Sequence, residues 1–505
     1  MGDNMEQETK YQEELSGLLK NRLEKMEFLK SKGINPFAYS YKKNADSTYL
    51  LEKYKSLEQG QESEEEYNIA GRIILKRGHG KAIFAHLQDG EGKIQIYVKF
   101  DNVGAEKFEI FEKIDIGDFI GARGKIFKTK TGEITLKVQD FTFLTKSLYP
   151  LPEKWHGLQD IELRYRHRYV DLIVNPDVKN LFKLRSKMIS HFRKYLEEKG
   201  FLEVETPILH VLQGGAAAKP FKTYHNALNM PLFLRIAPEL YLKRLIVGGF
   251  EKVFELGRVF RNEGMSVKHN PEYTMIEIYQ AYADYEDIMK LTEDLISDSV
   301  KTVFGKLKIK YKDFELDFTP PWKRIKLADA LKDFAGIDIS QPLEMLRKLA
   351  IERGVDEANS LGEGKLINEL YDRFVEPHLI QPTFIIDYPI ETSPLAKKKR
   401  DDPKLVERFE LIVAGMELAN AFSELNDPID QRKRFEKQME LKKAGDEEAE
   451  SLDEDYLRAL EYGMPPTGGL GIGIDRLIML LTDSHSIRDV LLFPHMRPID
   501  SKKQF

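Results

Sequence analysis

Residues 253–282 read VFELGRVFRNEGMSVKHNPEYTMIEIYQAY, and this stretch decides the fold that the sequence predicts. We expect two strands joined by a loop. Because side chains alternate between the faces of a strand, one face of the second strand carries Tyr273, Met275, Glu277 and Tyr279. The first strand and the loop direct further charged groups to the same region: Arg261, Glu263, Lys268 and His269. A solvated hairpin would carry lysine and threonine on its open face, so this convergence predicts a site on an antiparallel sheet.

The composition of the chain limits the functions that it can have. Its 505 residues are enough for several domains, and 32% charged against 42% hydrophobic residues is ordinary for a globular protein. A net charge of −6 means that any nucleic acid must be bound by local basic patches. The absence of cysteine excludes disulfides, thiolate zinc sites and cysteine nucleophiles.

The N-terminal sequence MGDNMEQETKYQEEL is polar and acidic, so it is unlike a secretory signal. No run approaches the roughly 18 apolar residues that a membrane span requires. We therefore expect a soluble, cytoplasmic protein without membrane contact.

Residues 1–62 are predicted to be a helical extension followed by a disordered stretch. One apolar stripe recurs at helical spacing: Leu15, Leu18, Leu19, Leu23, Met26 and Leu29. Gly33 and the Asn35-Pro36 pair end that helix. The acidic run 62–66 is interpreted as a solvated entry to the next domain.

Residues 63–146 switch to a period of two, which predicts a small closed β-barrel of the OB type. Five strands are expected at residues 67–76, 81–88, 93–100, 118–128 and 133–145. The first three combine basic and polar residues with an aromatic ring: Arg72, Lys76, Arg77, Lys81, Phe84, His86 and Gln95. Such a set is typical of a platform for single-stranded nucleic acid. A barrel core that contains Phe84, flanked by solvated lysines, fits these residues equally well.

Residues 147–178 contain crowded prolines and are predicted to be a hinge between domains. Residues 179–505 are predicted to form an α+β domain with an antiparallel sheet, flanking helices and a helical insertion at about 325–380. It begins with a helix over 181–196. A strand interrupted by Pro207 follows, which should lie at an edge or interface because proline cannot donate to a ladder.

The last third of the domain is predicted to hold a second hairpin, turning near Gly415. One face of its second strand carries Leu418, Asn420, Phe422 and Glu424. The segment PPTGGLGIGIDRLIMLLTD is predicted to be a glycine-rich turn that runs into a helix. Its glycines either punctuate a turn or let the backbone approach a ligand.

The chemistry that fits is nucleotide binding without a phosphate-binding P-loop. The sequence contains no GxxxxGK[ST], no HExxH and no GxSxG, and its glycines do not fit a dinucleotide fingerprint. Arg261 and Arg476 can neutralise phosphate oxygens through their planar guanidinium groups. Glu410 and Glu417, on either side of the hairpin turn, can hold a divalent cation that also touches phosphate.

Three segments occur in a fixed order: the helix and strand that end at Pro207, the FRNE and HNPEY segments of 260–273, and GGLGIGIDR ending at Arg476. With APELYLKRL, ELANAFSELNDP and a five-stranded barrel in front, they resemble the class II aminoacyl-tRNA synthetases. They are most similar to the bacterial-type lysyl-tRNA synthetases. The resemblance covers residues from about 10 to 500, and the class I signatures HIGH and KMSKS are absent.

The resemblance implies that ATP binds over the antiparallel sheet. Arg261 and Arg476 would be the catalytic residues, the first on the α-phosphate and the amino-acid carboxylate, the second on adenine and the γ-phosphate. Tyr273, where the family usually has phenylalanine, would stack on adenine. Glu263 and His269 would touch the base and the outer phosphates.

The resemblance also implies a magnesium site and a lysine pocket. Glu410 and Glu417 would bind Mg²⁺, and Glu410 would also belong to the ATP site. The lysine pocket would be lined by Gly215, Glu239, Glu277, Tyr279, Asn420, Phe422 and Glu424. Its three carboxylates suit a cationic side chain, whereas a pocket for aspartate would need arginine or lysine. We therefore expect lysine activation with ATP and transfer of lysine to the 3′ end of tRNA(Lys).

In the barrel, Phe84, Gln95 and Glu133 match positions that read the anticodon in the family. The first segment builds the class II dimer interface, so a homodimer is expected. Three alternatives are kept: an aspartate- or asparagine-type class II synthetase, a class II paralogue that attaches lysine to a protein, and a non-catalytic RNA-binding protein on this scaffold.

Overall fold

The computed structural model describes residues 2–152, 158–443 and 449–498. The chain divides into two units, residues 1–157 and residues 158–505. Within the described residues, no helix combines the length and apolarity that crossing a membrane would take.

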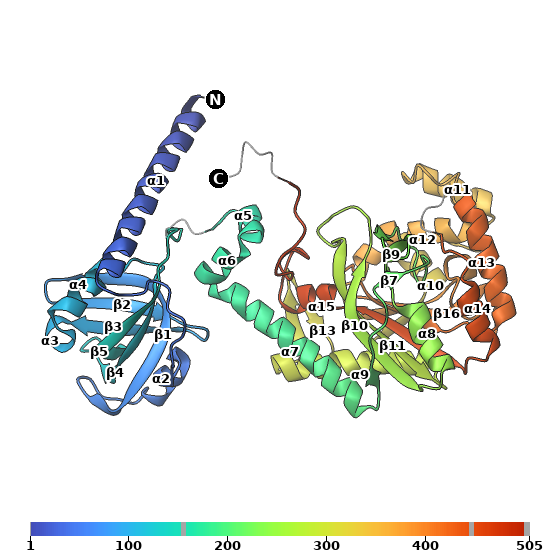
Figure 1. Ribbon diagram of the computed structural model, residues 1–505. Helices are drawn as coiled ribbons and strands as arrows, with labels where there is room; N and C mark the ends of the chain where they lie inside the picture. The colour runs from blue at the N-terminus through green and yellow to red at the C-terminus, as the bar shows by residue number, and fades with distance from the viewer. Residues whose placement is uncertain (1, 153–157, 444–448, 499–505) are drawn as a thin grey trace. The chain divides into compact units, whose positions relative to one another are not determined.

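The first unit is built on a closed five-stranded barrel (Figure 1). Its strands are β1 (Glu62–His79), β2 (Ala82–Gln88), β3 (Lys93–Lys99), β4 (Phe119–Lys128) and β5 (Ile134–Thr145). They pair in the order β1-β2-β3-β5-β4, and β1 closes the barrel on β4. Alternate residues point inward, such as Ile83, Ala85 and Leu87 of β2. The predicted OB-type barrel is confirmed.

The helices of this unit are α1 (Gly2–Ser31), α2 (Ser47–Lys53), α3 (Phe100–Val103) and α4 (Ala105–Lys113). The predicted disorder after the first helix is wrong. Ala38 donates to the Leu144 carbonyl (2.7 Å), and Asp46 caps α2, whose Leu50 is fully buried in the barrel core. The acidic run 62–66 forms the start of β1, and four of its five residues are exposed, which agrees with a solvated entry to the barrel. The predicted stripe of α1 is only partly buried: Leu29 is in the core, but Leu18 and Leu23 are exposed.

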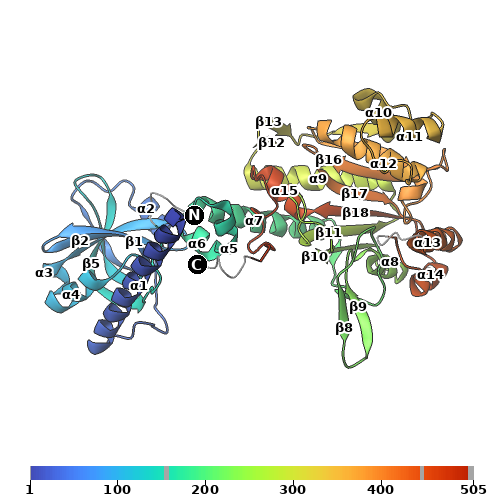
Figure 2. The ribbon, with the colours of Figure 1, turned by 90° about the horizontal axis from the view of Figure 1, so that it is seen from above.

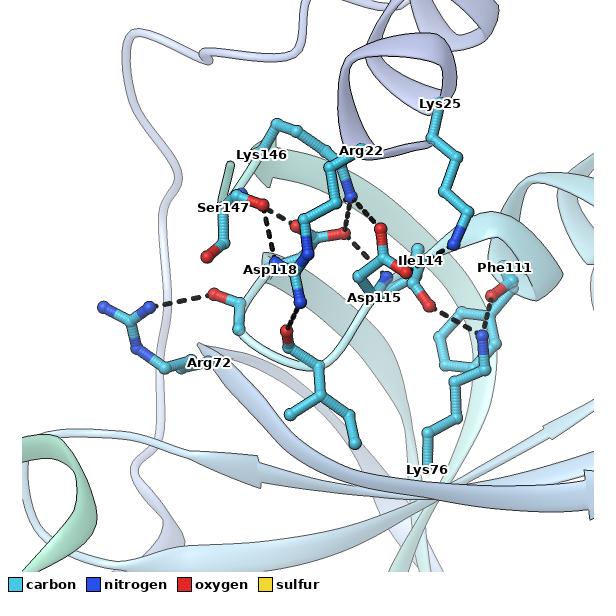
Figure 3. Close-up of polar contacts among 12 residues, drawn as sticks. Arg22, Lys25, Arg72, Lys76, Phe111, Ile114, Asp115, Asp118, Lys146 and Ser147 are labelled. Atoms are coloured by element: carbon cyan, nitrogen blue, oxygen red, sulfur yellow. Dashed lines mark hydrogen bonds and ion pairs between the residues drawn. The ribbon is translucent and has the colours of Figure 1, made fainter. Parts of the chain in front are cut away.

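A buried ion cluster fastens α1 to the barrel (Figure 3). The ammonium of Lys146, which has no exposed side-chain surface, lies 2.5 Å from Asp115 Oδ2 and 2.8 Å from Asp118 Oδ2. From α1, Lys25 pairs with Asp115 (2.5 Å), and Arg22 donates to the carbonyls of Ile116 (2.9 Å) and Ser147 (2.7 Å). The cluster is fully paired, as charges taken out of water require.

The second unit is built on an eight-stranded sheet with the order β14-β15-β16-β17-β18-β11-β10-β6. In chain order these strands are β6 (Leu202–Glu203), β10 (Lys252–Phe260), β11 (Glu272–Ala281), β14 (Lys323–Lys326), β15 (Thr383–Pro389), β16 (Leu405–Ile412), β17 (Glu417–Ser423) and β18 (Thr467–Gly473). All pairs are antiparallel except the two outermost, β6 on β10 and β14 on β15. The predicted edge strand is β6, with Pro207 just beyond it. The α+β class is confirmed.

Two small sheets and several helices complete this unit. The sheets are β7 (Leu209–His210), β8 (Lys222–His225) with β9 (Met230–Leu234), and β12 (Lys308–Tyr311) with β13 (Phe314–Asp317). The helices are α5 (Ile161–Arg166), α6 (Arg168–Val174), α7 (Pro176–Glu198), α8 (Glu239–Val247), α9 (Tyr285–Phe304), α10 (Leu327–Ala335), α11 (Leu343–Glu352), α12 (Glu363–Phe374), α13 (Pro428–Lys443), α14 (Glu454–Glu461) and α15 (Ile474–Leu481). Short 3₁₀ turns cover Glu376–His378 and Ile390–Thr392.

The two faces of the large sheet have different roles. On one face, Ile276 and Ile278 of β11 and Leu470 and Ile472 of β18 pack in a core with α7 and α9, which lie along the sheet (Figure 1). The residues between them in sequence therefore point to the opposite face. The insertion helices α10, α11 and α12 share a second core with Ile325 of β14, Ile385 of β15 and Val406 of β16, and they lie beside β16 in Figure 2.

One sequence expectation for this unit needs correction, and two others gain detail. The glycine-rich segment is not a turn, because residues 467–473 form the central strand β18. The predicted helical insertion at about 325–380 holds α10, α11 and α12, and the segment that leads into it contains the β12–β13 hairpin and β14. Residues 158–178, the second half of the predicted hinge, fold as α5, α6 and the start of α7 within the second unit.

Candidate active site

A cavity of about 630 Å³ opens on the second face of the large sheet. Its wall brings together the catalytic-domain residues that the sequence singled out: Gly215, Glu239, Arg261, Glu263, His269, Tyr273, Glu277, Tyr279, Glu410, Glu417, Asn420, Phe422, Glu424 and Arg476. The insertion adds α12, through Lys365, Asn368 and Asp372. Residues up to about 260 positions apart in sequence thus meet in one cavity.

The register of three strands explains the floor of this cavity. Tyr279 of β11 lies opposite Gly469 of β18, and Gly469 lies opposite Phe422 of β17. A Cβ at Gly469 would overlap Glu424 Oε1 and would lie 2.7 Å from Tyr279 Cε1. Glycine is therefore required at this position so that two site side chains can fold over the strand.

The end of the cavity farthest along β11 from Arg261 is acidic. Glu239, Glu277 and Glu424 are each at most 8% exposed, and Tyr279 donates to Glu277 Oε2 (3.1 Å). Burial, together with the charge of Glu239, raises the pKa of Glu277 to about 8. A cation that enters this end of the cavity would favour the ionised form of Glu277.

Lys243 is a fully buried cation behind two of these acids, and the sequence reasoning missed it. Its Nζ lies 2.6 Å from Glu239 Oε1, forms an ion pair with Glu424 and lies 5.4 Å from the centre of the Phe422 ring. Burial acts to lower the pKa of Lys243, but the two carboxylates raise it well above its ordinary value. The i, i+4 spacing from Glu239 on one helix was a sequence signal for the first contact. No sequence signal indicated the contact to Glu424.

The opposite end of the cavity is organised around Arg261 and Tyr273. The guanidinium carbon of Arg261 lies 5.5 Å from the centre of the Tyr273 ring. The buried Nε of Arg261 has no hydrogen-bond partner within the described parts of the chain. A buried donor without a partner is costly, so this arginine has hydrogen-bonding capacity for a ligand.

Arg476 joins the helix after β18 to the loop of the first hairpin. It donates to the Glu417 carbonyl (2.6 Å) and to Glu417 Oε2 (3.2 Å), and its other terminal nitrogen lies 3.2 Å from His269 Nε2. Burial acts to raise the pKa of Glu417, but Arg476 and Arg261 lower it below its ordinary value. Glu417 is therefore ionised at neutral pH.

Glu410 lies beside Glu417 in the cavity wall and is held by two donors. Tyr388 donates to Glu410 Oε2 (2.8 Å), and Arg408 donates to Glu410 Oε1 (2.5 Å). Arg408, also missed from the sequence, donates to Asn420 Oδ1 (2.9 Å) as well and so links the two ends of the cavity. Among residues 2–152, 158–443 and 449–498, no three acidic or histidine side chains form a metal cage. A cation shared between these two carboxylates and a phosphate fits this donor set, since Mg²⁺ is usually bound by one or two carboxylates plus phosphates.

Asp475 locks the three sequence segments together beneath the site. Its two oxygens accept hydrogen bonds from Arg185 of α7 (2.5 Å) and from the Thr274 amide of β11 (2.6 Å). Arg185 also donates to Thr274 Oγ1 (3.0 Å). The helix of the first segment, the strand of the second and the helix of the third are therefore held in one hydrogen-bonded group.

In the barrel, the candidate nucleic-acid residues form a connected group on β2, on β3 and in the turn just before β5. Glu133 accepts from Gln95 (2.7 Å) and contacts His86 Nε2 (3.0 Å). Phe84 lies outside the core face of β2 and packs on Tyr97, with ring centres 4.6 Å apart. The interpretation of Phe84 as a core residue is therefore wrong. Lys76 donates to the carbonyls that end α4, so it is not a free cation of this surface.

Comparison with known proteins agrees with both units. Residues 160–497 match the class II tRNA synthetases (D, K and N), and residues 67–144 match the OB-fold nucleic acid binding domain. Fold, site and family match together define a class II tRNA synthetase.

Relatives that match over nearly the full length of the chain show which family of this class it belongs to. The chain is 56% identical over 493 residues to the lysine–tRNA ligase of Pelotomaculum thermopropionicum, covering 96% of each chain. It is 55% identical to the lysine–tRNA ligase of Carboxydothermus hydrogenoformans (97% and 99% covered) and to that of Bacillus subtilis (98% and 100% covered). The chain belongs to the lysine–tRNA ligase family.

Proposed function

We propose that this enzyme activates L-lysine with ATP to lysyl-adenylate and pyrophosphate, and then transfers lysine to the 3′ end of tRNA(Lys). The observation that carries the proposal is the acidic end of the cavity, where Glu239, Glu277 and Glu424 face a space large enough for an amino acid. Carboxylates at this depth select a cationic side chain.

The two ends of the cavity suggest how the first step proceeds. The lysine carboxylate attacks the α-phosphorus of ATP in line and needs no general base, because it is already ionised. Arg261 would hold both reacting groups and stabilise the charge that develops on the α-phosphate. Tyr273 and Arg476 would hold the adenine between them, and Glu263 and His269 would contact the base and the outer phosphates.

Mg²⁺ is proposed as the cofactor, with Glu410 and Glu417 as its protein ligands. When bound, it would neutralise phosphate charge during the displacement of pyrophosphate. Asn420, Phe422, Tyr279 and the loop residue Gly215 would complete the contacts to lysine.

The first alternative is that the substrate is aspartate or asparagine, and the position of Lys243 argues against it. A buried lysine is the group that an aspartate site would need, but Lys243 is already paired with Glu239 and Glu424. Lys243 is not among the described residues that line the cavity. The pocket therefore presents carboxylates and favours lysine.

A paralogue that attaches lysine to a protein is the second rival. The OB-fold domain argues for tRNA, with Phe84, Gln95 and Glu133 proposed to contact the anticodon. Charging purified tRNA(Lys) with labelled lysine tests this choice. Label on tRNA supports the proposal, whereas lysine-dependent adenylate formation without any tRNA product contradicts it.

We further propose that the enzyme acts as a homodimer in the cytoplasm, where its tRNA substrate is used. The segment of α7 and Pro207 is the proposed interface. Light scattering should give a mass of two 58.5 kDa chains, and a monomer mass at micromolar concentration would contradict the dimer.

A further inference from the structure

Glu450 is a buried carboxylate in the cavity wall that the proposed mechanism does not use. It lies just before α14, and the whole residue is 2% exposed. Its amide donates weakly to Gln438 Oε1 (3.4 Å), and its side chain lines the same cavity as Gly215 and Glu239.

The carboxylate of Glu450 is only half satisfied. It accepts a hydrogen bond from the Gly215 amide, but its buried Oε2 has no partner among the described residues. Burial and the nearby charge of Glu239 raise the pKa of Glu450 to about 8, against the opposing effect of Lys243. Leaving a buried acceptor unpaired costs free energy, so a ligand that donates to it would recover that cost.

The neighbouring cations are already engaged elsewhere. Lys243 is held by Glu239 and Glu424. Lys442 donates to Ser451 Oγ (2.9 Å) and to Gln213 Oε1 (3.3 Å). The Tyr456 side chain, which also lies near Glu450, carries a hydroxyl and no positive charge, and this hydroxyl has no partner among the described residues. A donor from the cavity can therefore complete Glu450, and a cationic donor would in addition favour its ionised form.

We propose that Glu450 is a fourth carboxylate of the amino-acid pocket, and that it accepts a hydrogen bond from an ammonium group of the bound substrate beside Gly215 and Glu239. This inference rests on the proposed function, because lysine supplies two ammonium groups and one carboxylate. Arg261 would bind the substrate carboxylate, and Glu277 and Glu424 would bind one of the two ammonium groups. The other ammonium group would then bind at the wall formed by Glu239 and Glu450.

The test is ATP–pyrophosphate exchange with the full-length chain, comparing wild type, Glu450→Gln and a matched control, Glu440→Gln. Glu440 is an exposed acid on α13. The variant Glu450→Gln should raise the KM for lysine about ten- to hundred-fold, which is the effect of losing a charge-assisted hydrogen bond. The KM for ATP should stay unchanged, and Glu440→Gln should match wild type.

Three further measurements sharpen this result. Thermal unfolding without ligand should show Glu450→Gln folded, because glutamine keeps an acceptor for the Gly215 amide. Glu450→Asp, which withdraws the carboxylate by one methylene, should also raise the KM for lysine. Inhibition by 6-aminohexanoate, which lacks the α-ammonium, and by norleucine, which lacks the ε-ammonium, should show that one of the two loses affinity in Glu450→Gln.

The outcomes separate this inference from the proposed function. If wild type exchanges with lysine but Glu450→Gln keeps the same KM for lysine, the inference is wrong and the proposed function stands. Equal losses for lysine and ATP, or analogue inhibition that does not change, would also overturn it. If wild type itself shows no lysine-dependent exchange, the proposed function fails and the inference fails with it.

Discussion

Charge balance decides how single residues act at the acidic end of the cavity. Glu239 and Glu424 are each close to the ammonium of Lys243, while among the described residues the side chain that donates to Glu277 is the Tyr279 hydroxyl. One resident cation thus offsets only part of the negative charge of the buried carboxylates at this end of the cavity. Selectivity for a cationic amino acid would follow from this deficit of positive charge.

Replacing Glu424 by glutamine should damage lysine use and spare ATP use. The carboxylate is 1% exposed, so its loss removes an attraction that water does not screen. We expect the KM for lysine to rise by at least about ten-fold, with little change in the KM for ATP. Steady-state exchange kinetics measure both. The variant Glu461→Gln, at an exposed position, is the control. Equal losses for the two substrates would contradict the assignment of Glu424 to the lysine pocket.

Replacing Lys243 by methionine should destabilise the protein by about 3–5 kcal/mol at pH 7.5, because it leaves two buried carboxylates without their cation. The deficit should shrink at pH 5.5, where the carboxylates can be protonated. Denaturant unfolding at both pH values measures it. Lys194→Met, which removes an exposed pair of 3.8 Å with Glu198, should cost no more than about 1 kcal/mol. A pH-independent deficit for Lys243→Met would contradict the pairing.

The raised pKa of Glu277 predicts how lysine affinity varies with pH. Because the pKa is about 8 in the free protein, Glu277 is mostly protonated at pH 6–7, and binding a cation releases its proton. Lysine affinity should therefore rise between pH 6 and pH 8, and Glu277→Gln should flatten this rise. The same raised pKa means that its contribution to folding stability is lost as pH rises through 8. Calorimetric titration at three pH values measures the affinity, and an affinity that falls over this range contradicts the assignment.

Periodicity predicted part of this site and could not predict the rest. The alternation of β11 correctly placed Tyr273, Glu277 and Tyr279 on one face, because a strand has only two faces. The pairing of Lys243 with Glu424 depends on how α8 packs beside the end of β17, and no local pattern encodes that distance. Glu450 was missed for the same reason.

Strand β18 is the element on which the pocket depends most. Its glycines looked like turn residues in sequence, since glycine is disfavoured within strands. In the sheet they leave room for side chains from β11 and from the end of β17. The sequence did not predict this strand, because the glycines are required by side chains that pack against them in the tertiary structure and not by the local backbone conformation.

Two alanine substitutions in β18 should therefore differ sharply. In Gly469→Ala the new methyl group would overlap Glu424 and crowd Tyr279, whereas in Gly471→Ala the nearest atom is Met275 Sδ at 3.6 Å. We expect Gly469→Ala to lose about 1–3 kcal/mol of unfolding free energy, as overpacked sites do, and to bind lysine poorly. Gly471→Ala should stay within about 1 kcal/mol of wild type. Equal thermal stability of the two variants would contradict the close approach at Gly469.

At the scale of the whole molecule, sequence patterns predicted the architecture better than its details. The five barrel strands and the first hairpin were recognisable because short alternating segments stand between clear turns. The β12–β13 hairpin was missed because two four-residue strands are too short to show a period. Disorder was wrongly expected after the first helix within residues 1–62, because only a few apolar residues of that segment, such as Ala45 and Leu50, pack into the barrel core.

Both units serve one proposed reaction, with the barrel for tRNA and the large sheet for lysine and ATP. The most direct measurement of this account is ATP–pyrophosphate exchange by the purified chain with a panel of amino acids. We predict exchange with lysine, and none with aspartate or asparagine. Exchange that depends on aspartate or asparagine and not on lysine would contradict it.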